Sequence, residues 1–220
     1  MHFFKALRNL KTSKEIRKYK AIDLGLPSGL KWANKNVGAE KETDYGLYFQ
    51  WGDVVGYNDA SHSTWETCPG NGGDSSYNAK SIAAWDAENL KSGAGMGYVT
   101  EILKPEADAA TVNMGSKWRM PTMEDCAELL SNTNYEYVII EGVKGGKFIS
   151  KSDASKYIFL PFAGVAAEGS FGYQGVGGLV WSSSVYSDTP AYAYFMSADE
   201  SVYVDSADRR FHALSVRGVC

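Results

Sequence analysis

The stretch Gly115–Thr122 constrains the fold more than any other part of this chain. Thr122 suits the N-cap of a helix, and Asp125 stands at the position where a capping box places its acid. Apolar residues then recur at helical spacing on one face, at Cys126, Leu129 and Leu130. The pattern predicts a loop that turns before Thr122 and starts a short helix over residues 122–131.

Arg119 lies between two bulky apolar residues, Trp118 and Met120. An arginine in such a setting usually directs its guanidinium to a carboxylate or to backbone carbonyl oxygens. Because buried charges are mostly structural when they are paired, we interpret this corner as a stabilising part of the fold. We assign it no direct chemical role.

Residues Trp118–Thr122 are similar to a signature of C-type-lectin-fold domains of the formylglycine-generating-enzyme type, in which Trp-Arg is followed by Leu or Met and then Pro-Thr. The chain more closely resembles the major paralogous surface domains of Bacteroidetes and Fibrobacter. Further stretches match in the same order: Ala21–Ala33 with Asn36–Ala39, Tyr45–Gly52, and Trp181–Ser184 with Leu214–Cys220. Some proteins of this kind are variable proteins of diversity-generating retroelements, whose C-terminal segment is hypermutated for ligand binding.

The resemblance, which covers residue 21 to the end, implies an α+β fold of the C-type-lectin type. Two helices would flank a mixed, mainly antiparallel sheet, with the chain ends close together and the ligand surface on the C-terminal strands and adjacent loops. Composition agrees with a loop-rich α+β domain, since the 220 residues include 23 glycines and 14 tyrosines. We expect one domain over residues 21–220, preceded by a basic arm over residues 1–20.

Charge is unevenly distributed between the arm and the domain. Residues 1–20 carry seven Lys or Arg and one Glu, so they contribute +6, and the rest of the chain must carry −10 to give the overall −4. An acidic domain is poorly matched to nucleic acid, whose phosphates are bound by basic groups. We therefore expect no nucleic-acid partner.

The arm also has an amphipathic pattern, because its apolar residues fall near one helical face: Phe3, Phe4, Leu7 and Leu10. Such a segment suits a membrane surface or docking on a partner, while the simpler interpretation is a tail that attaches the domain to its own assembly or a partly disordered terminus. The pattern lacks the apolar stretch and cleavage site of a secretory signal, and no segment has the length and apolarity expected of a membrane span.

The remaining pattern predicts short elements joined by long loops. Helices are expected over residues 105–114 and 122–131, with one or two helical turns within 83–90, and residues 56–80 are expected to form a long polar surface loop. A glycine-rich loop is expected over 164–178, with turns at Asp199-Glu200 and Ala207-Asp208. Strands are expected within 21–33 and 37–51, and over 135–140, 147–150, 157–162, 180–183, 191–197, 201–205 and 211–219.

Three cysteines, Cys68, Cys126 and Cys220, give neither a disulfide framework nor metal-ligand spacing. Cys126 is expected to be buried in its helix. A Cys68–Cys220 bridge is conceivable, but nothing in the pattern supports it. Oxygen-using relatives of the formylglycine type depend on two reactive cysteines close together late in the chain, where this chain has only Cys220. That departure argues against their reaction.

No pattern of a catalytic, metal or phosphate site stands out. His2, His62 and His212 lie apart from one another and from other ligand-type residues, so we expect no zinc. The serines at 182–184 lack a nucleophile elbow and an obvious base, and the glycines at 70–73 and 175–178 do not open a helix after a strand. We expect no enzyme activity, no cofactor and no bound metal.

Calcium requires a separate consideration. The acidic and amide side chains within 71–74 and 205–208 offer oxygen atoms, but they lack EF-hand spacing and the sugar-binding triplets of calcium-dependent lectins. Solvated acids in turns are the simpler interpretation.

The C-terminal segment carries the strongest pattern for binding. In the strand expected over 191–197, Tyr192, Tyr194 and Met196 share one face, and both faces hold large side chains. Tyrosine and arginine supply contact area and directed hydrogen bonds at low entropic cost. The candidate ligand-binding residues are Tyr173, Gln174, Tyr186, Asp188, Tyr192, Tyr194, Tyr203, Asp205, Asp208, Arg209, Arg210, Phe211 and His212.

These observations predict a non-catalytic protein that binds a protein or glycan ligand on a cell surface. We expect a retroelement-diversified receptor-binding protein or adhesin on a virion or bacterial surface, attached to an assembly partner through the arm of residues 1–20. Two alternatives stay open. One is a formylglycine-type oxidoreductase, which needs two adjacent thiols, and the other is a structural module whose aromatic segment packs on a neighbouring subunit in an oligomer.

Overall fold

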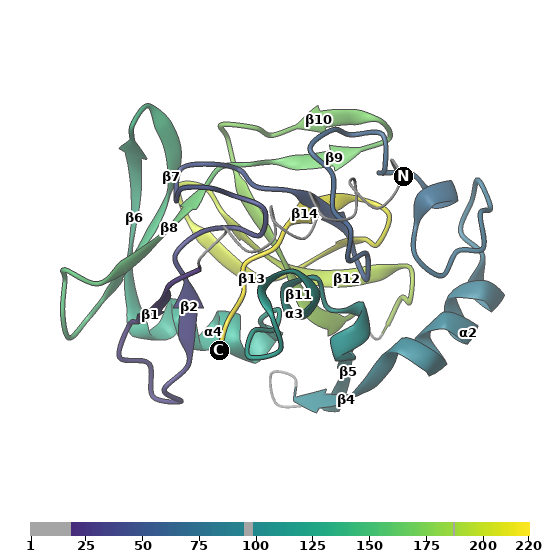
Figure 1. The fold of residues 1–220 in the computed structure, drawn as a ribbon, viewed down its shortest axis with the longest axis horizontal. Coiled ribbons are helices and arrows are strands. Elements are labelled where there is room, and N and C mark those ends of the chain that lie inside the picture. Colours follow the sequence, from purple (N-terminus) through teal and green to yellow (C-terminus); the bar gives the residue numbers. More distant parts are fainter. Residues whose placement is uncertain (1–18, 95–98, 187) are drawn as a thin grey trace, which may run out of the picture.

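The computed structural model describes residues 19–94, 99–186 and 188–220, which form a mixed structure of helices and sheets (Figure 1). Strands predominate: the described residues contain three α-helices and 14 strands. The expected mixture of helix and sheet is confirmed, whereas the expectation of two helices is wrong. Most of the proposed arm, residues 1–18, lies outside the described residues. Tyr19 and Lys20 already contact the domain, since Lys20 N donates to Asn34 Oδ1 at 2.8 Å.

The helices are α2 (Ala79–Asn89), α3 (Ala109–Met114) and α4 (Met123–Asn132), with 3-10 turns η1 (Trp65–Thr67) and η2 (Pro105–Ala107). Helix α4 begins where the sequence predicted. Thr122 Oγ1 accepts from Asp125 N at 3.2 Å, and Asp125 Oδ2 accepts from Thr122 N at 2.7 Å. The reciprocal bonds of the capping box are therefore confirmed.

Two helix predictions need correction. The helix expected over 105–114 is divided, because Asp108 ends η2 and caps α3 by accepting from Thr111 N at 2.8 Å. The one or two turns expected within 83–90 are a helix of 11 residues, which Asn78 caps through Ser81 N. Ile82 is the one buried residue of α2, so its apolar periodicity was too weak to identify its length.

The largest sheet has nine strands, in the order β10-β9-β14-β11-β12-β13, with β3 beside β14 and the β4–β5 hairpin beside β11. β11 and β14 run parallel, while the other pairs of this sheet are antiparallel. The hairpin of β12 and β13 therefore forms one end of the sheet, with β13 at its edge. The strands are β3 (Tyr48–Gln50), β4 (Leu90–Ala94), β5 (Val99–Leu103), β9 (Val165–Ala167), β10 (Ser170–Gly172), β11 (Gly178–Val185), β12 (Tyr192–Ala198), β13 (Val202–Arg209) and β14 (Ala213–Ser215).

Two smaller sheets complete the fold. One joins β6 (Thr133–Ile140), β7 (Val143–Ser150) and β8 (Tyr157–Pro161), and the other pairs β1 (Ala21–Asp23) with β2 (Lys31–Ala33). The last residues of the chain bond to β2: Lys31 N donates to Cys220 O, and Cys220 N donates to Lys31 O, both at 2.9 Å. The C-terminal end therefore lies beside the first hairpin of the domain, as the resemblance implies.

Several strand and turn predictions also need correction. The loop expected over 164–178 contains the β9–β10 hairpin, and the β4–β5 hairpin was not expected at all. Gly146, which falls between the strands expected over 135–140 and 147–150, lies in β7, where a Cβ atom would meet the Tyr135 ring at 2.5 Å. The strand expected over 211–219 is only the three residues of β14. The turn before β14 is formed by residues 210–212. Ala207 and Asp208, which were expected to form it, lie within β13.

The core lies on both faces of the β11–β12 pair. Trp181 pairs with Phe195 on one face, which also packs against Trp51. Val180 pairs with Met196 on the other face, which packs under α4. The alternation expected along β12 is confirmed: Tyr192 and Tyr194 lie on the same face as Met196. On that face Met196 is buried, whereas Tyr192 and Tyr194 are only half-buried.

Candidate functional site

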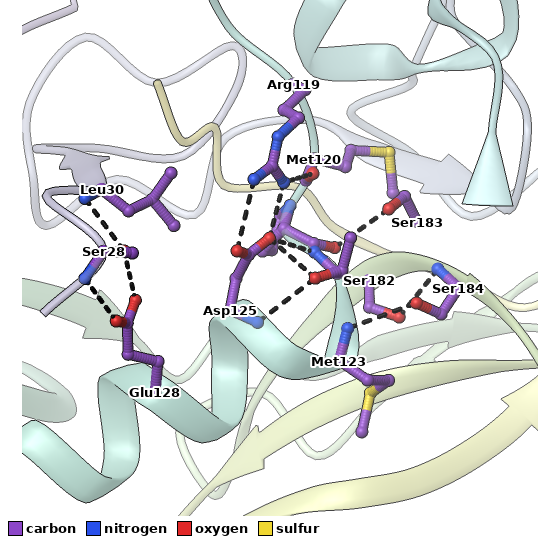
Figure 2. A network of polar contacts seen from close by, with 12 residues as sticks. Ser28, Leu30, Arg119, Met120, Met123, Asp125, Glu128, Ser182, Ser183 and Ser184 are labelled. Carbon is purple, nitrogen blue, oxygen red and sulfur yellow. Dashed lines mark hydrogen bonds and ion pairs between the residues drawn. The ribbon is translucent and has the colours of Figure 1, made fainter. Parts of the chain in front are cut away.

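The corner at Arg119 is hydrogen-bonded to β11 (Figure 2). Ser183 N donates to Pro121 O at 2.7 Å, and Met123 N donates to Ser184 Oγ at 3.2 Å. The Arg119 guanidinium donates to Asp125 Oδ1 at 3.2 Å and to Met120 O at 3.0 Å. The predicted pairing of this arginine with a carboxylate and a carbonyl is therefore confirmed.

The two ends of the C-terminal segment form a buried frame. In β11, Trp181 Nε1 donates to Phe49 O at 2.8 Å, and Ser182 O accepts from Trp51 Nε1 at 2.9 Å. All residues of the two frame stretches, Trp181–Ser184 and Leu214–Arg217, are buried. Because both stretches are buried, they fix the backbone on either side of the residues between them.

Arg217 connects this frame to other parts of the fold. Its side chain is fully buried, and its guanidinium donates to Asn36 Oδ1 at 2.9 Å and to the carbonyl oxygens of Ala33 and Phe159 at 2.8 Å each. Burial lowers the pKa of the Arg217 guanidinium to about 9, which still leaves it charged at neutral pH. The arginine thus joins β2, the loop after it and β8 to the C-terminal segment.

Between the frame stretches, four of the predicted residues gather at the open end of the β12–β13 hairpin. The Tyr186 ring lies 5.1 Å from that of Tyr194 and 6.5 Å from that of Tyr192, measured between centroids. Arg209 pairs with Tyr192 across the strands, and its Nε lies 3.4 Å from the tyrosine oxygen. The tyrosines are half-buried and Arg209 is exposed. We call Tyr186, Tyr192, Tyr194 and Arg209 the tyrosine patch.

Three acids and a histidine of the predicted set lie on or beside the same hairpin. Asp188 and Asp205 are exposed. Asp208 Oδ2 lies 2.8 Å from His212 Nδ1, so these two form a local pair near the end of β13. Asp208 pairs with Ala193 across the strands, which places it on the face opposite the tyrosine patch.

Arg210 and Phe211 do not belong to a ligand surface, and that part of the prediction is corrected. Arg210 is fully buried, donates to both carboxylate oxygens of Asp86 on α2, and lies with its guanidinium carbon 4.5 Å from the Trp51 ring centroid. Phe211 is buried against the Trp65 ring at 4.8 Å. Both residues follow the last residue of β13, so the sequence places them beside exposed residues although they turn into the core.

The other end of the hairpin borders a groove of about 440 Å³. Of the predicted residues only Tyr203 lines it, while Tyr173 and Gln174 lie exposed in the loop that leads into it. Gln174 Nε2 also donates to the Tyr48 hydroxyl at 2.9 Å. We call this site the turn groove; its lining consists of Tyr137, Lys144, Phe162, Gly175, Val176, Asp199, Glu200, Ser201 and Tyr203.

Sequence reasoning missed most of the turn groove because its walls come from four separate segments. Tyr137 and Lys144 belong to the β6–β7 hairpin, and Val176 belongs to the loop before β11. The one available signal was the alternation of Tyr135, Tyr137 and Ile139 along β6, which leaves large apolar groups on one face.

A second hollow, of about 390 Å³, adjoins the Arg119 corner and includes Lys117, Trp118 and Cys220 in its lining. All three cysteines are free. Burial raises the pKa of the Cys68 thiol to about 12 and raises that of Cys126 as well. These two buried thiols are therefore protonated at neutral pH and are poor nucleophiles.

Among the described residues, no three His, Cys, Asp or Glu side chains gather as ligands of a metal ion. In the same part of the chain, no helix has the length and apolarity needed to cross a membrane. Comparison with family models, with curated proteins and with solved structures finds no match to this chain.

Proposed function

We propose that this chain is a non-catalytic binding protein with a C-type-lectin-like scaffold, and that the β12–β13 hairpin carries its ligand surface. One observation supports this above all: two buried frame stretches bracket a hairpin at the sheet end that presents tyrosines, acids and an arginine. A fixed frame lets the exposed side chains change without loss of the fold. Half-buried tyrosines on strands are rigid contact groups that lose little entropy on binding.

The proposed ligand is a protein or glycan on a cell surface, and the proposed location is a virion or a bacterial surface. The tyrosine patch offers three aromatic rings and one guanidinium within a small area. Such groups are enriched among the residues that dominate binding energy in protein interfaces. The basic arm of residues 1–20 would attach the domain to its assembly.

Single substitutions in the tyrosine patch test this function. Wild type, Tyr192→Ala, Tyr194→Ala and Arg209→Ala are compared on an array of cell-surface proteins and glycans. Each substitution should weaken the binding of a retained ligand by about tenfold or more, because each removes a contact worth about 1–2 kcal/mol. Glu88→Ala, on the exposed side of α2, is the control and should bind like wild type. Patch variants that bind as well as wild type would refute the proposed surface.

We further propose that a diversity-generating retroelement varies this segment. The buried frame stretches would correspond to codons that such a system keeps fixed, and the exposed hairpin between them to codons that it varies. Sequencing the neighbouring DNA provides the test. The proposal requires a near-copy of codons 170–220 that differs at adenines, and a reverse transcriptase gene beside it. If both are lacking, diversification is refuted while ligand binding remains open to the array test.

The two alternatives make different predictions. An oxidase of the formylglycine type needs a pair of adjacent reactive thiols, whereas Cys68 and Cys126 are buried with raised pKa values. A structural module would instead form a stable oligomer through the aromatic segment. Size-exclusion chromatography with light scattering distinguishes it, since the same tyrosine-patch substitutions would then dissociate the oligomer.

A further inference from the structure

The turn groove is a second surface, separate from the tyrosine patch. Tyr192 is the first residue of β12, and Asp199, which lines the groove, follows the last. At about 3.3 Å per residue, the two sites lie roughly 20 Å apart along the strand. A ligand in one of them need not touch the other.

The walls of the groove are aromatic and exposed. Tyr137 is 43% exposed, Tyr203 is 53% exposed, and Val176 in the same lining is 60% exposed. The Tyr137 ring rests on the buried Phe162 ring, with centroids 5.8 Å apart. Large apolar side chains gathered in one exposed hollow indicate a binding site more strongly than the same side chains scattered over the surface.

The polar groups of the groove are of mixed charge. Asp199 and Glu200 stand at the β12–β13 turn, and Lys144 stands at the start of β7. The turn is held in place, because Asp199 Oδ1 accepts from Ser201 N at 2.8 Å and the Tyr135 hydroxyl donates to Asp199 O. Neither the Lys144 nor the Glu200 side chain has a hydrogen bond or ion pair with the described residues, so both remain available to a ligand.

This combination restricts the chemistry of the ligand. The groove holds two carboxylates and one ammonium group, so it repels strong anions and offers a ligand both hydrogen-bond acceptors and donors. A sugar hydroxyl both donates and accepts, so it satisfies acids and lysine alike. The tyrosine faces suit the flat C–H face of a pyranose ring, because an aromatic ring offers an apolar surface with a negative face.

We propose that the turn groove binds a neutral carbohydrate directly, without a bridging metal ion. Tyr137 and Tyr203 would stack on the sugar rings, the two carboxylates would accept from hydroxyls, and Lys144 would donate to them. A volume of about 440 Å³ is in the range of small-ligand pockets and suits a short saccharide better than a long chain. The proposal goes beyond the function assigned to the tyrosine patch and stands whether or not that patch binds a ligand.

The test uses an array of immobilised neutral glycans, acidic glycans and lysine- or arginine-rich peptides, with the purified full chain. Wild type is compared with Tyr137→Ala, Tyr203→Ala and Glu200→Gln. Glu88→Ala, on the exposed side of α2, is the control, and Tyr192→Ala is added to report binding at the tyrosine patch. Dense immobilisation compensates for the weak affinity expected of an open groove.

We expect wild type to retain a neutral glycan, and to retain it equally with a chelator present. Tyr137→Ala and Tyr203→Ala should weaken that binding by about tenfold, which corresponds to losing one stacking contact with its buried area. Glu200→Gln should weaken it less, and Glu88→Ala should leave it unchanged. Since Tyr203 is exposed on an edge strand, its substitution tests the groove even if Tyr137→Ala fails to fold.

Three results would overturn the proposal: no neutral glycan is retained, the Tyr203→Ala variant binds it like wild type, or only charged glycans or basic peptides are retained. Loss of binding in Tyr192→Ala but not in Tyr203→Ala would also overturn it, while supporting the tyrosine patch. The experiment therefore tests the turn groove and the tyrosine patch independently of each other.

Discussion

At the scale of single residues, two arginines show why charge type alone does not identify a site. Arg209 and Arg210 are neighbours in the sequence, yet Arg209 is exposed beside Tyr192 and Arg210 is fully buried on Asp86. The bend after β13 separates them. A sequence reader cannot tell which of the two side chains turns inward without knowing that α2 supplies a carboxylate 124 residues away.

The buried pair leads to a stability prediction. Asp86→Ala should destabilise the fold by about 3–5 kcal/mol, because it leaves the Arg210 guanidinium buried without its counter-charge. Urea unfolding of wild type and variant measures this difference. Glu88→Ala, two residues further on the same helix and exposed, should change stability by less than about 0.5 kcal/mol. Equal effects of the two substitutions would show that the pair contributes no stability.

The thiols give a second prediction at this scale. In the native protein at pH 8, iodoacetamide should modify Cys220 first, because Cys68 and Cys126 are buried and their raised pKa values keep them protonated. Intact-mass spectrometry should show one alkylated cysteine in buffer and three in denaturant. Rapid native labelling of Cys68 or Cys126 would contradict their burial and revive the oxidoreductase alternative.

At the scale of elements, local chemistry decided which parts were predictable. Helix α4 was predicted correctly because Thr122 and Asp125 cap it and its apolar residues share one face. In helix α2 only Ile82 is buried, and the core residues that pack against the helix lie far from it in the sequence. The turn groove was missed for the same reason, since Tyr137, Val176 and Tyr203 meet only in the folded chain.

The capping box leads to a prediction for α4. Thr122→Ala should destabilise the protein by about 1 kcal/mol, because it leaves the Asp125 amide without its acceptor. Thr122→Ser keeps the hydroxyl and should cost much less. Asp125→Ala should cost more than either, since Asp125 also binds Arg119. Thermal unfolding of the three variants orders them, and a Thr122→Ser variant as unstable as Thr122→Ala would rule out the capping bond as the cause.

At the scale of the whole molecule, the buried elements that hold the fold together are separate from the exposed hairpin that is proposed to bind a ligand. The central strands β11 and β14 and Arg217 are largely buried, and they are bonded to distant parts of the chain, as is the half-buried Arg119 corner. The β12–β13 hairpin lies at the sheet end and carries the tyrosine patch at one end and the turn groove at the other. This division is the basis for proposing a binding protein, in which the ligand surface is free to change on a fixed frame.

The most direct test removes the whole tyrosine patch at once. A variant carrying Tyr192→Ala, Tyr194→Ala and Arg209→Ala is compared with wild type for binding to an array of cell-surface proteins and glycans, and both are checked by thermal unfolding. We predict that the variant remains folded, because these side chains lie outside the two main core clusters, and that it loses binding to a ligand that wild type retains. A folded variant that binds every retained ligand as tightly as wild type would contradict the account.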